Sequence, residues 1–61
     1  MVYSLYFEDS EEYQCGYNII ADTDKEAKKE AKDYLSKLKY YSNVSFCRLN
    51  GDGTITRIRL K

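Results

Sequence analysis

Five lysines between positions 25 and 39 are spaced so that one side of a helix would collect them. These are Lys25, Lys28, Lys29, Lys32 and Lys39. At about 100° per residue they share a sector of about 100°, while Glu26, Glu30 and Asp33 gather on the next one. Such a lysine ridge could receive a phosphate backbone or an acidic protein surface. The alternative is a solvated helix back that keeps a small domain soluble.

A second group combines one aromatic ring with aliphatic and guanidinium side chains. It consists of Tyr6, Ile20, Ile55, Arg57 and Arg59. Strand alternation assigns all of them to a sheet face that no helix covers, and Cys47 is a further candidate for that face. We expect the two arginines to lie close enough to Tyr6 for stacking on its ring. This face suits a protein interface, a homodimer, a nucleic-acid surface or simple surface pairing.

Two short segments resemble cation-binding loops but lack the charges that such loops need. Asn50, Asp52 and Gly53 match the third, fifth and sixth places of a calcium loop, whereas Arg48 and Arg59 occupy the first and twelfth. We therefore interpret residues 50–53 as a hairpin turn. The carboxylates of residues 8–12 are interpreted as a solvated turn. We expect no metal site and no cofactor.

The sequence lacks the residue sets on which catalysis usually depends. It has no His, which removes the commonest general base and metal ligand. For a nucleophilic cysteine, the only hint is Arg48 next to Cys47. No nucleophile–base pair and no phosphate loop can be recognised. We therefore expect neither an enzyme nor a small-molecule substrate.

Charge is separated along the chain, although its net value is zero. The first 24 residues contain six acidic residues and no Lys or Arg, whereas the remaining 37 contain ten Lys or Arg and four acidic residues. Separated charge of this kind guides the approach and orientation of a partner and says little about the fold.

Hydrophobic periodicity predicts four strands around one helix. The predicted strands are residues 2–8, 13–21, 44–49 and 54–60. Thr23 and Glu26 have the spacing of a capping box, so the helix should begin there and end near Tyr40. Its inward stripe consists of Ala27, Ala31, Tyr34, Leu35, Leu38 and Tyr41. Gly16, inside the second strand, indicates a bulge or a close approach of another group.

Inward positions can be predicted for most strands. On the first strand Tyr3, Leu5 and Phe7 share one side, and on the last strand Thr56, Ile58 and Leu60 point inward. The third strand leaves two alternatives open. Its inward set is either Val44 and Phe46, or Ser45, Cys47 and Leu49.

The element order ββαββ predicts one α+β domain over residues 1–61, in which one helix packs on one face of a four-stranded mixed sheet. A right-handed crossover favours the strand order 2-1-4-3, with the first and last strands parallel in the middle. This arrangement is similar to the β-grasp of small bacterial immunoglobulin-binding domains. The segment MVYSLYF resembles the opening strand of such a domain. The resemblance implies a fold only. In this order Cys15 and Cys47 would lie about 14 Å apart, too far for a disulfide.

The sequence favours a small interaction module, an accessory or inhibitor protein that binds a protein partner by charge complementarity and Tyr/Arg contacts. Short chains rich in Lys, Tyr and Ile are typical of phage and other mobile elements. One alternative is nucleic-acid binding through the lysine ridge or the Arg57/Arg59 face, and another is a homo-oligomeric structural unit. The sequence shows no secretion signal and no apolar run that could span a membrane, so we expect a cytoplasmic protein.

Overall fold

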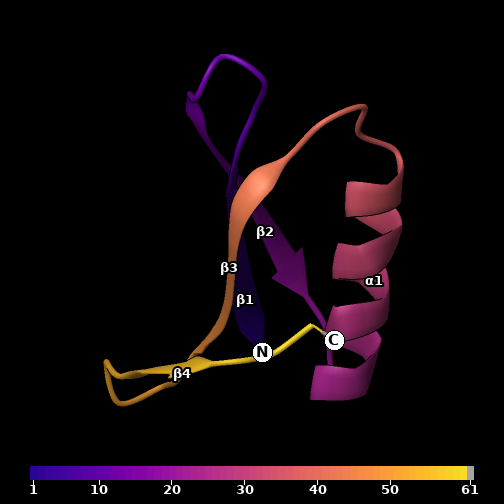
Figure 1. Ribbon diagram of the computed structural model, residues 1–61. Coiled ribbons are helices and arrows are strands. Elements are labelled where there is room, and N and C mark those ends of the chain that lie inside the picture. The colour runs from indigo at the N-terminus through magenta and orange to yellow at the C-terminus, as the bar shows by residue number, and fades with distance from the viewer. Residues whose placement is uncertain (61) are drawn as a thin grey trace.

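A computed structural model describes residues 1–60, which form a four-stranded sheet with one helix on one of its faces (Figure 1). The elements are β1 (Val2–Glu8), β2 (Gln14–Ile20), α1 (Asp24–Ser36), β3 (Ser42–Leu49) and β4 (Ile55–Arg57). The α+β class, the single helix and the order of elements along the chain agree with the prediction.

The sheet is antiparallel throughout and has the order β2-β1-β3-β4. The predicted order 2-1-4-3 with a parallel central pair is therefore wrong, and so is the β-grasp arrangement. β3 lies beside β1 and pairs with it from Val2 to Glu8, whereas β4 has only three residues. The longer strand satisfies more of the backbone N–H and C=O groups of the central strand, which accounts for its place.

The pairing of β3 with β1 shows which side chains of β3 face α1. Phe46 lies opposite Leu5 and faces α1, whereas Cys47 lies opposite Ser4 and faces away from it. Phe46 is buried, in agreement with the first of the two predicted sets, but Val44 is 38% exposed at the margin of the core. A register shift between β1 and β3 accompanies a positive φ of 52° at Asn43, a residue type that tolerates this conformation.

The helix begins where the sequence predicted and ends one turn earlier. Thr23 caps it, because its hydroxyl oxygen accepts a hydrogen bond from the N–H of Glu26 at 3.2 Å. The last helical residue is Ser36, not Tyr40. The hydroxyl of Ser36 donates a hydrogen bond to the carbonyl oxygen of Asp33 at 2.7 Å. This side-chain bond competes with the backbone hydrogen bonds that would extend the helix.

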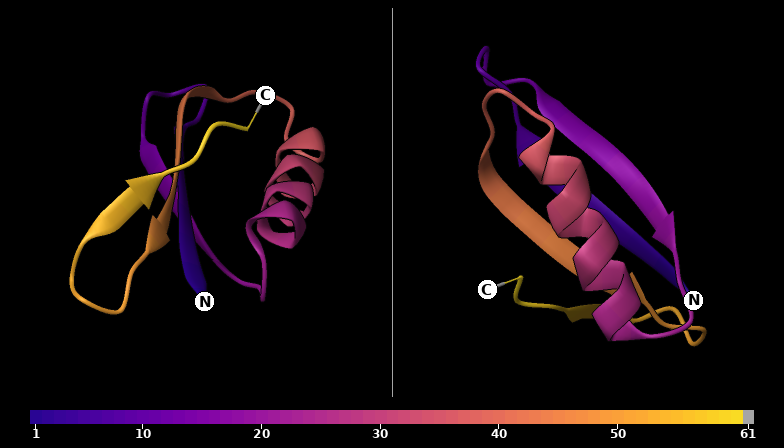
Figure 2. Two further views of the ribbon diagram at one scale, coloured as in Figure 1. Left: turned by 90° about the horizontal axis from the view of Figure 1, so that it is seen from below. Right: turned by 90° about the vertical axis from the view of Figure 1, so that its right-hand side faces the viewer.

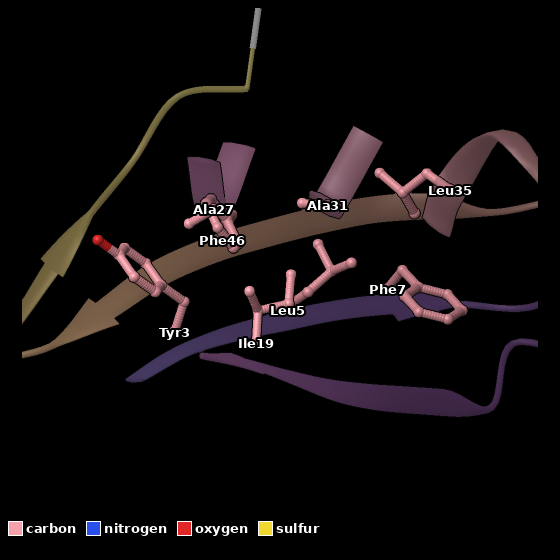
Figure 3. Close-up of a cluster of buried hydrophobic side chains, with 8 residues drawn as sticks. All are labelled: Tyr3, Leu5, Phe7, Ile19, Ala27, Ala31, Leu35 and Phe46. Carbon is pink, nitrogen blue, oxygen red and sulfur yellow. The ribbon is translucent and has the colours of Figure 1, made fainter. Parts of the chain in front are cut away.

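The core lies between α1 and the sheet (Figure 3). It consists of Tyr3, Leu5, Phe7, Ile19, Ala27, Ala31, Leu35 and Phe46. The ring of Tyr3 stacks on that of Phe46, with centroids 5.7 Å apart. The rings of Tyr34 and Tyr17 stack with their centroids 4.1 Å apart, so the second half of α1 packs on β2. The two buried alanines have short side chains, so the helix backbone can lie close to the sheet.

After Arg57 the chain leaves the sheet and crosses toward α1 (Figure 2). The N–H of Ile58 donates to the carbonyl of Phe46 at 2.8 Å, and the side chains of Ile58 and Leu60 pack against the core. Their predicted inward orientation is confirmed, although only residues 55–57 of the predicted last strand are extended sheet. Within residues 1–60 no helix has the length and apolar character required to cross a membrane.

Candidate interaction surfaces

The sheet face opposite α1 carries an apolar row that crosses all four strands. Ile20 lies opposite Val2, Val2 opposite Leu49, and Leu49 opposite Ile55. Directly opposed residues point to the same side of a sheet, so the four side chains adjoin one another. All four are exposed, from 39% for Val2 to 79% for Ile20. We call this set the apolar row. Ile20 and Ile55 were expected on this face, but a single row forms only because β3 lies between β1 and β4.

Beside the apolar row, the polar groups of the same face are already paired. The hydroxyl of Ser4 donates to the side-chain oxygen of Asn18 at 3.3 Å, and the thiol of Cys47 donates to the carbonyl of Ser4 at 3.8 Å. Ser4 and Cys47 are only 4% and 7% exposed. Cys47 therefore belongs to this face, as expected, but its thiol is covered.

Tyr6 lies on this face and packs on Gly16 of the neighbouring strand. A Cβ atom at Gly16 would come within 3.2 Å of the Tyr6 ring, so the predicted close approach at this glycine is confirmed. The expected stacking of Arg57 and Arg59 on Tyr6 is wrong. β3 separates β1 from β4, and Arg59 lies beyond the end of β4, where the chain has left the sheet.

Four of the five predicted ridge lysines lie together on α1. Lys25, Lys28, Lys29 and Lys32 line one shallow hollow on the helix, and we call them the lysine ridge. Lys39 follows the end of the helix and does not extend the ridge, because α1 stops at Ser36. The ion pairs within residues 1–60 are Lys37–Asp33 and Arg48–Asp24, so none of the ridge lysines forms an ion pair there. The carboxylates of Asp24 and Glu26 line the same hollow as the four lysines.

A cleft of about 680 Å³ lies between α1, β3 and the C-terminal segment. Its apolar lining includes Leu35, Phe46, Ile58 and Leu60, and the exposed residues Lys32 and Arg59 also line it. Arg57 borders the cleft with its backbone, because its pairing with Cys47 directs its side chain to the open face of the sheet. Within the described part of the chain no Asp or Glu lines it. The cleft exists because α1 packs nearest to β2 and leaves the α1 side of β3 incompletely covered. Sequence reasoning missed it, since it depends on the chain leaving the sheet after Arg57. We call it the cationic cleft.

A polar network joins the start of α1 to the sheet. The Tyr3 hydroxyl donates to the Asp24 carboxylate at 2.6 Å, and the Arg48 guanidinium donates to both Asp24 oxygens at 3.0 and 2.9 Å. Burial, and then the bond to Asp24, raise the pKa of Tyr3. The Tyr3 hydroxyl, and then Arg48, lower the pKa of Asp24. Tyr3 thus keeps its proton and Asp24 its charge, which makes this network a structural link and not an acid–base pair.

The loop between β1 and β2 is an ordered acidic turn. The carboxylate of Asp9 accepts hydrogen bonds from the N–H groups of Glu11 and Tyr13 at 2.9 and 3.0 Å. Glu12 has a φ of 65°, which completes the reversal of the chain. The side chains of Glu11 and Glu12 are exposed, and Tyr13 is 66% exposed beside them. We call residues 9–13 the acidic tip.

The β3–β4 turn is a hairpin turn, as predicted. The N–H of Asn50 donates to the carbonyl of Thr54 at 2.9 Å, and Gly53 adopts a φ of 92° that favours glycine. The Asp52 carboxylate accepts from the Thr54 hydroxyl at 2.7 Å, which lowers the pKa of Asp52. Within residues 1–60 no group of three or more Cys, Asp and Glu side chains is arranged to hold a metal ion.

The two cysteines are free. Cys15 lies opposite Phe7 and faces α1, whereas Cys47 lies opposite Ser4 on the other face. They were expected on opposite edges of the sheet, but Cys47 belongs to the inner strand β3. A disulfide is prevented instead by the two faces and by the strand between them.

No protein-family model, curated protein or solved structure matches this chain.

Proposed function

We propose that this chain is a small, non-enzymatic interaction module that docks on another protein through the open face of its sheet. The observation that carries the proposal is the apolar row, in which four exposed aliphatic side chains adjoin across the whole sheet. On single-domain proteins a contiguous exposed apolar patch marks an interaction site. Arg57 borders the row, Tyr6 lies on the same face one step beyond Ser4, and both residue types are enriched in protein interfaces.

The polar groups near the apolar row support docking. The Ser4 hydroxyl and the Cys47 thiol already donate to Asn18 and to the backbone, so a partner that covers them leaves neither donor without a hydrogen bond. Burial of the row then gains hydrophobic free energy with little penalty for polar desolvation. The flat sheet offers contact area rather than an enclosed volume for a substrate, which suits a macromolecular partner.

The thiols and charges of the chain also support a cellular compartment and a way in which a partner would approach. The free thiols of Cys15 and Cys47 are typical of the reducing cytoplasm. Separated charge along the chain would steer the partner before apolar contact forms. We therefore propose an accessory or inhibitor protein of the kind that mobile elements encode.

Site-specific photo-crosslinking in cells that produce the protein tests this proposal. A photoreactive residue at Ile20 or Ile55 should form a crosslink to another protein, whereas one at Glu30, on the exposed side of α1, should not. The substitution Leu49→Ser, in the same row, should weaken both crosslinks. A product of twice the chain mass would identify a homo-oligomer instead, and equal crosslinking from Glu30 would contradict the proposal.

The lysine ridge favours nucleic-acid binding as a second candidate function. Four neighbouring ammonium groups that form no ion pair in the described chain outnumber the two carboxylates of the same hollow, and phosphates can contact them. Retention on DNA or RNA should then fall with rising salt. Replacing all four ridge lysines by Gln should flatten the salt slope, by up to about 0.9 per lost contact. Lys37→Gln, which removes a lysine already paired with Asp33, is the matched control. Equal slopes for all three proteins would exclude this function.

A further inference from the structure

We propose that the acidic tip of one copy of this chain docks in the cationic cleft of a second copy. The cleft combines an apolar lining with the cations Lys32 and Arg59 and has no Asp or Glu among its described lining residues. The acidic tip presents the complementary set, an exposed tyrosine ring beside exposed carboxylates. This inference concerns surfaces other than the apolar row and does not depend on the function proposed above.

The position of the cations favours a peptide segment over a single-headed amphiphile. Lys32 comes from α1, whereas Arg59 comes from the C-terminal segment that follows β4. A ligand with one anionic head would need cations at only one place along the cleft. Cations from two parts of the chain fit an apolar side chain with carboxylates around it, and neither Lys32 nor Arg59 has an ion-pair partner within residues 1–60.

The acidic tip has the aromatic ring, the carboxylates and the fixed turn conformation that docking in the cationic cleft requires. Tyr13 provides a large ring with a polar hydroxyl, which can enter the cleft and keep its oxygen near water. Glu11 and Glu12 are close enough in the chain to meet the cations of the cleft through charge-assisted hydrogen bonds. The bonds to the Asp9 carboxylate already hold the turn in place, so docking loses little conformational entropy.

Within one molecule the tip does not occupy the cleft, because none of residues 9–13 lines it. The tip is the turn between β1 and β2 (Figure 1), whereas the residues that line the cleft come from α1, β3 and the C-terminal segment. Each copy thus offers one tip and one cleft, an interface of the head-to-tail kind that either closes a ring or extends into a chain. The contact is small and charged, so we expect weak association that salt opposes.

Sedimentation velocity of the full chain tests the proposal. Wild-type protein should show a mass that rises with concentration in low salt and returns toward the monomer at about 0.5 M salt, where screening is nearly complete. A tip variant carries Glu11→Gln, Glu12→Gln and Tyr13→Ser, and a cleft variant carries Lys32→Gln and Arg59→Gln. Each variant alone should remain monomeric. An equimolar mixture should form dimers and nothing larger, because only one intact tip and one intact cleft are available per pair.

Two controls keep the result specific. Glu26→Gln with Glu30→Gln removes two carboxylates from the exposed side of α1 and should leave association unchanged. Ile20→Ser alters the apolar row and should also leave it unchanged. Wild-type protein that stays monomeric in low salt, or a variant mixture that does not associate, would overturn the proposal. So would association that survives in both variants but disappears with Ile20→Ser, since the apolar row would then be the contact. Circular dichroism should confirm that every variant is folded.

Discussion

Leu5 and Leu35 both belong to the core, yet their replacement by alanine should cost different free energies of unfolding. Leu5 is fully buried on the central strand β1, between Tyr17 on β2 and Phe46 on β3. Leu35 is 5% exposed and borders the cationic cleft. A cavity at Leu5 is enclosed, so we expect Leu5→Ala to cost about 4–5 kcal/mol, near the upper end of such substitutions. The space left by Leu35→Ala joins the cleft and can relax, so we expect about 2–3 kcal/mol.

These losses have visible consequences in so small a domain. At about 0.05–0.15 kcal/mol per residue, the whole chain should be stable by about 3–9 kcal/mol. Both variants should therefore lose a large share of the total stability, and the urea midpoint of Leu5→Ala should lie well below that of Leu35→Ala. Urea denaturation followed by circular dichroism measures both, and an unchanged m-value shows that the comparison is valid. Leu5→Met, which nearly conserves volume, is the matched control and should cost less than about 1.5 kcal/mol.

Two outcomes would refute this reasoning. Equal costs for the two alanine variants would mean that the cleft does not relieve the cavity at Leu35. A cost below about 0.5 kcal/mol for Leu35→Ala would mean that the assigned inward face of α1 is wrong.

Two further predictions concern the polar network and the thiols. The pKa of Asp24 is lowered from 3.8, so its stabilising effect is complete above that value and is lost as the pH falls through the folded-state pKa. Asp24→Asn should therefore flatten the decline in melting temperature on acidification, and an unchanged acid decline would contradict the link between Asp24, Tyr3 and Arg48. Thiol titration without reductant should find two free thiols per unfolded chain, and in the folded protein the half-buried Cys15 should react before the covered Cys47. A disulfide between Cys15 and Cys47 would contradict their placement on opposite faces of the sheet.

Local patterns in the sequence were sufficient to predict most elements. Alternation in residues 2–8 identified β1 and its inward side, and the Thr23–Glu26 spacing identified the start of α1. These features depend on neighbours within a few residues, where steric and hydrogen-bonding preferences act directly. The early end of α1 was missed, because Tyr41 continues the apolar spacing although the backbone has already left the helix.

Strand order could not be predicted in the same way. It depends on whether β3 or the C-terminal segment pairs with β1, a competition between contacts that are distant in sequence. The pattern of residues 54–60 is typical of a full strand, yet only Ile55–Arg57 join the sheet. Ile58 and Leu60 keep their inward orientation by packing near α1 instead, so their apolar side chains fit both arrangements and do not distinguish them.

Both proposed surfaces follow from that one choice of partner for β1. With β3 beside β1, Val2 and Leu49 become direct neighbours, and the apolar row runs unbroken from β2 to β4. The same choice moves the last residues to the edge beyond β3, where Arg59 stands across from Lys32 and the cleft opens between them. In the 2-1-4-3 order the last strand would have filled the middle of the sheet, separating Val2 from Leu49 and leaving no C-terminal segment to form the cleft wall. A variant that changes the pairing of β1 with β3 should therefore alter both surfaces together, whereas the lysine ridge, which depends only on the local geometry of α1, should persist.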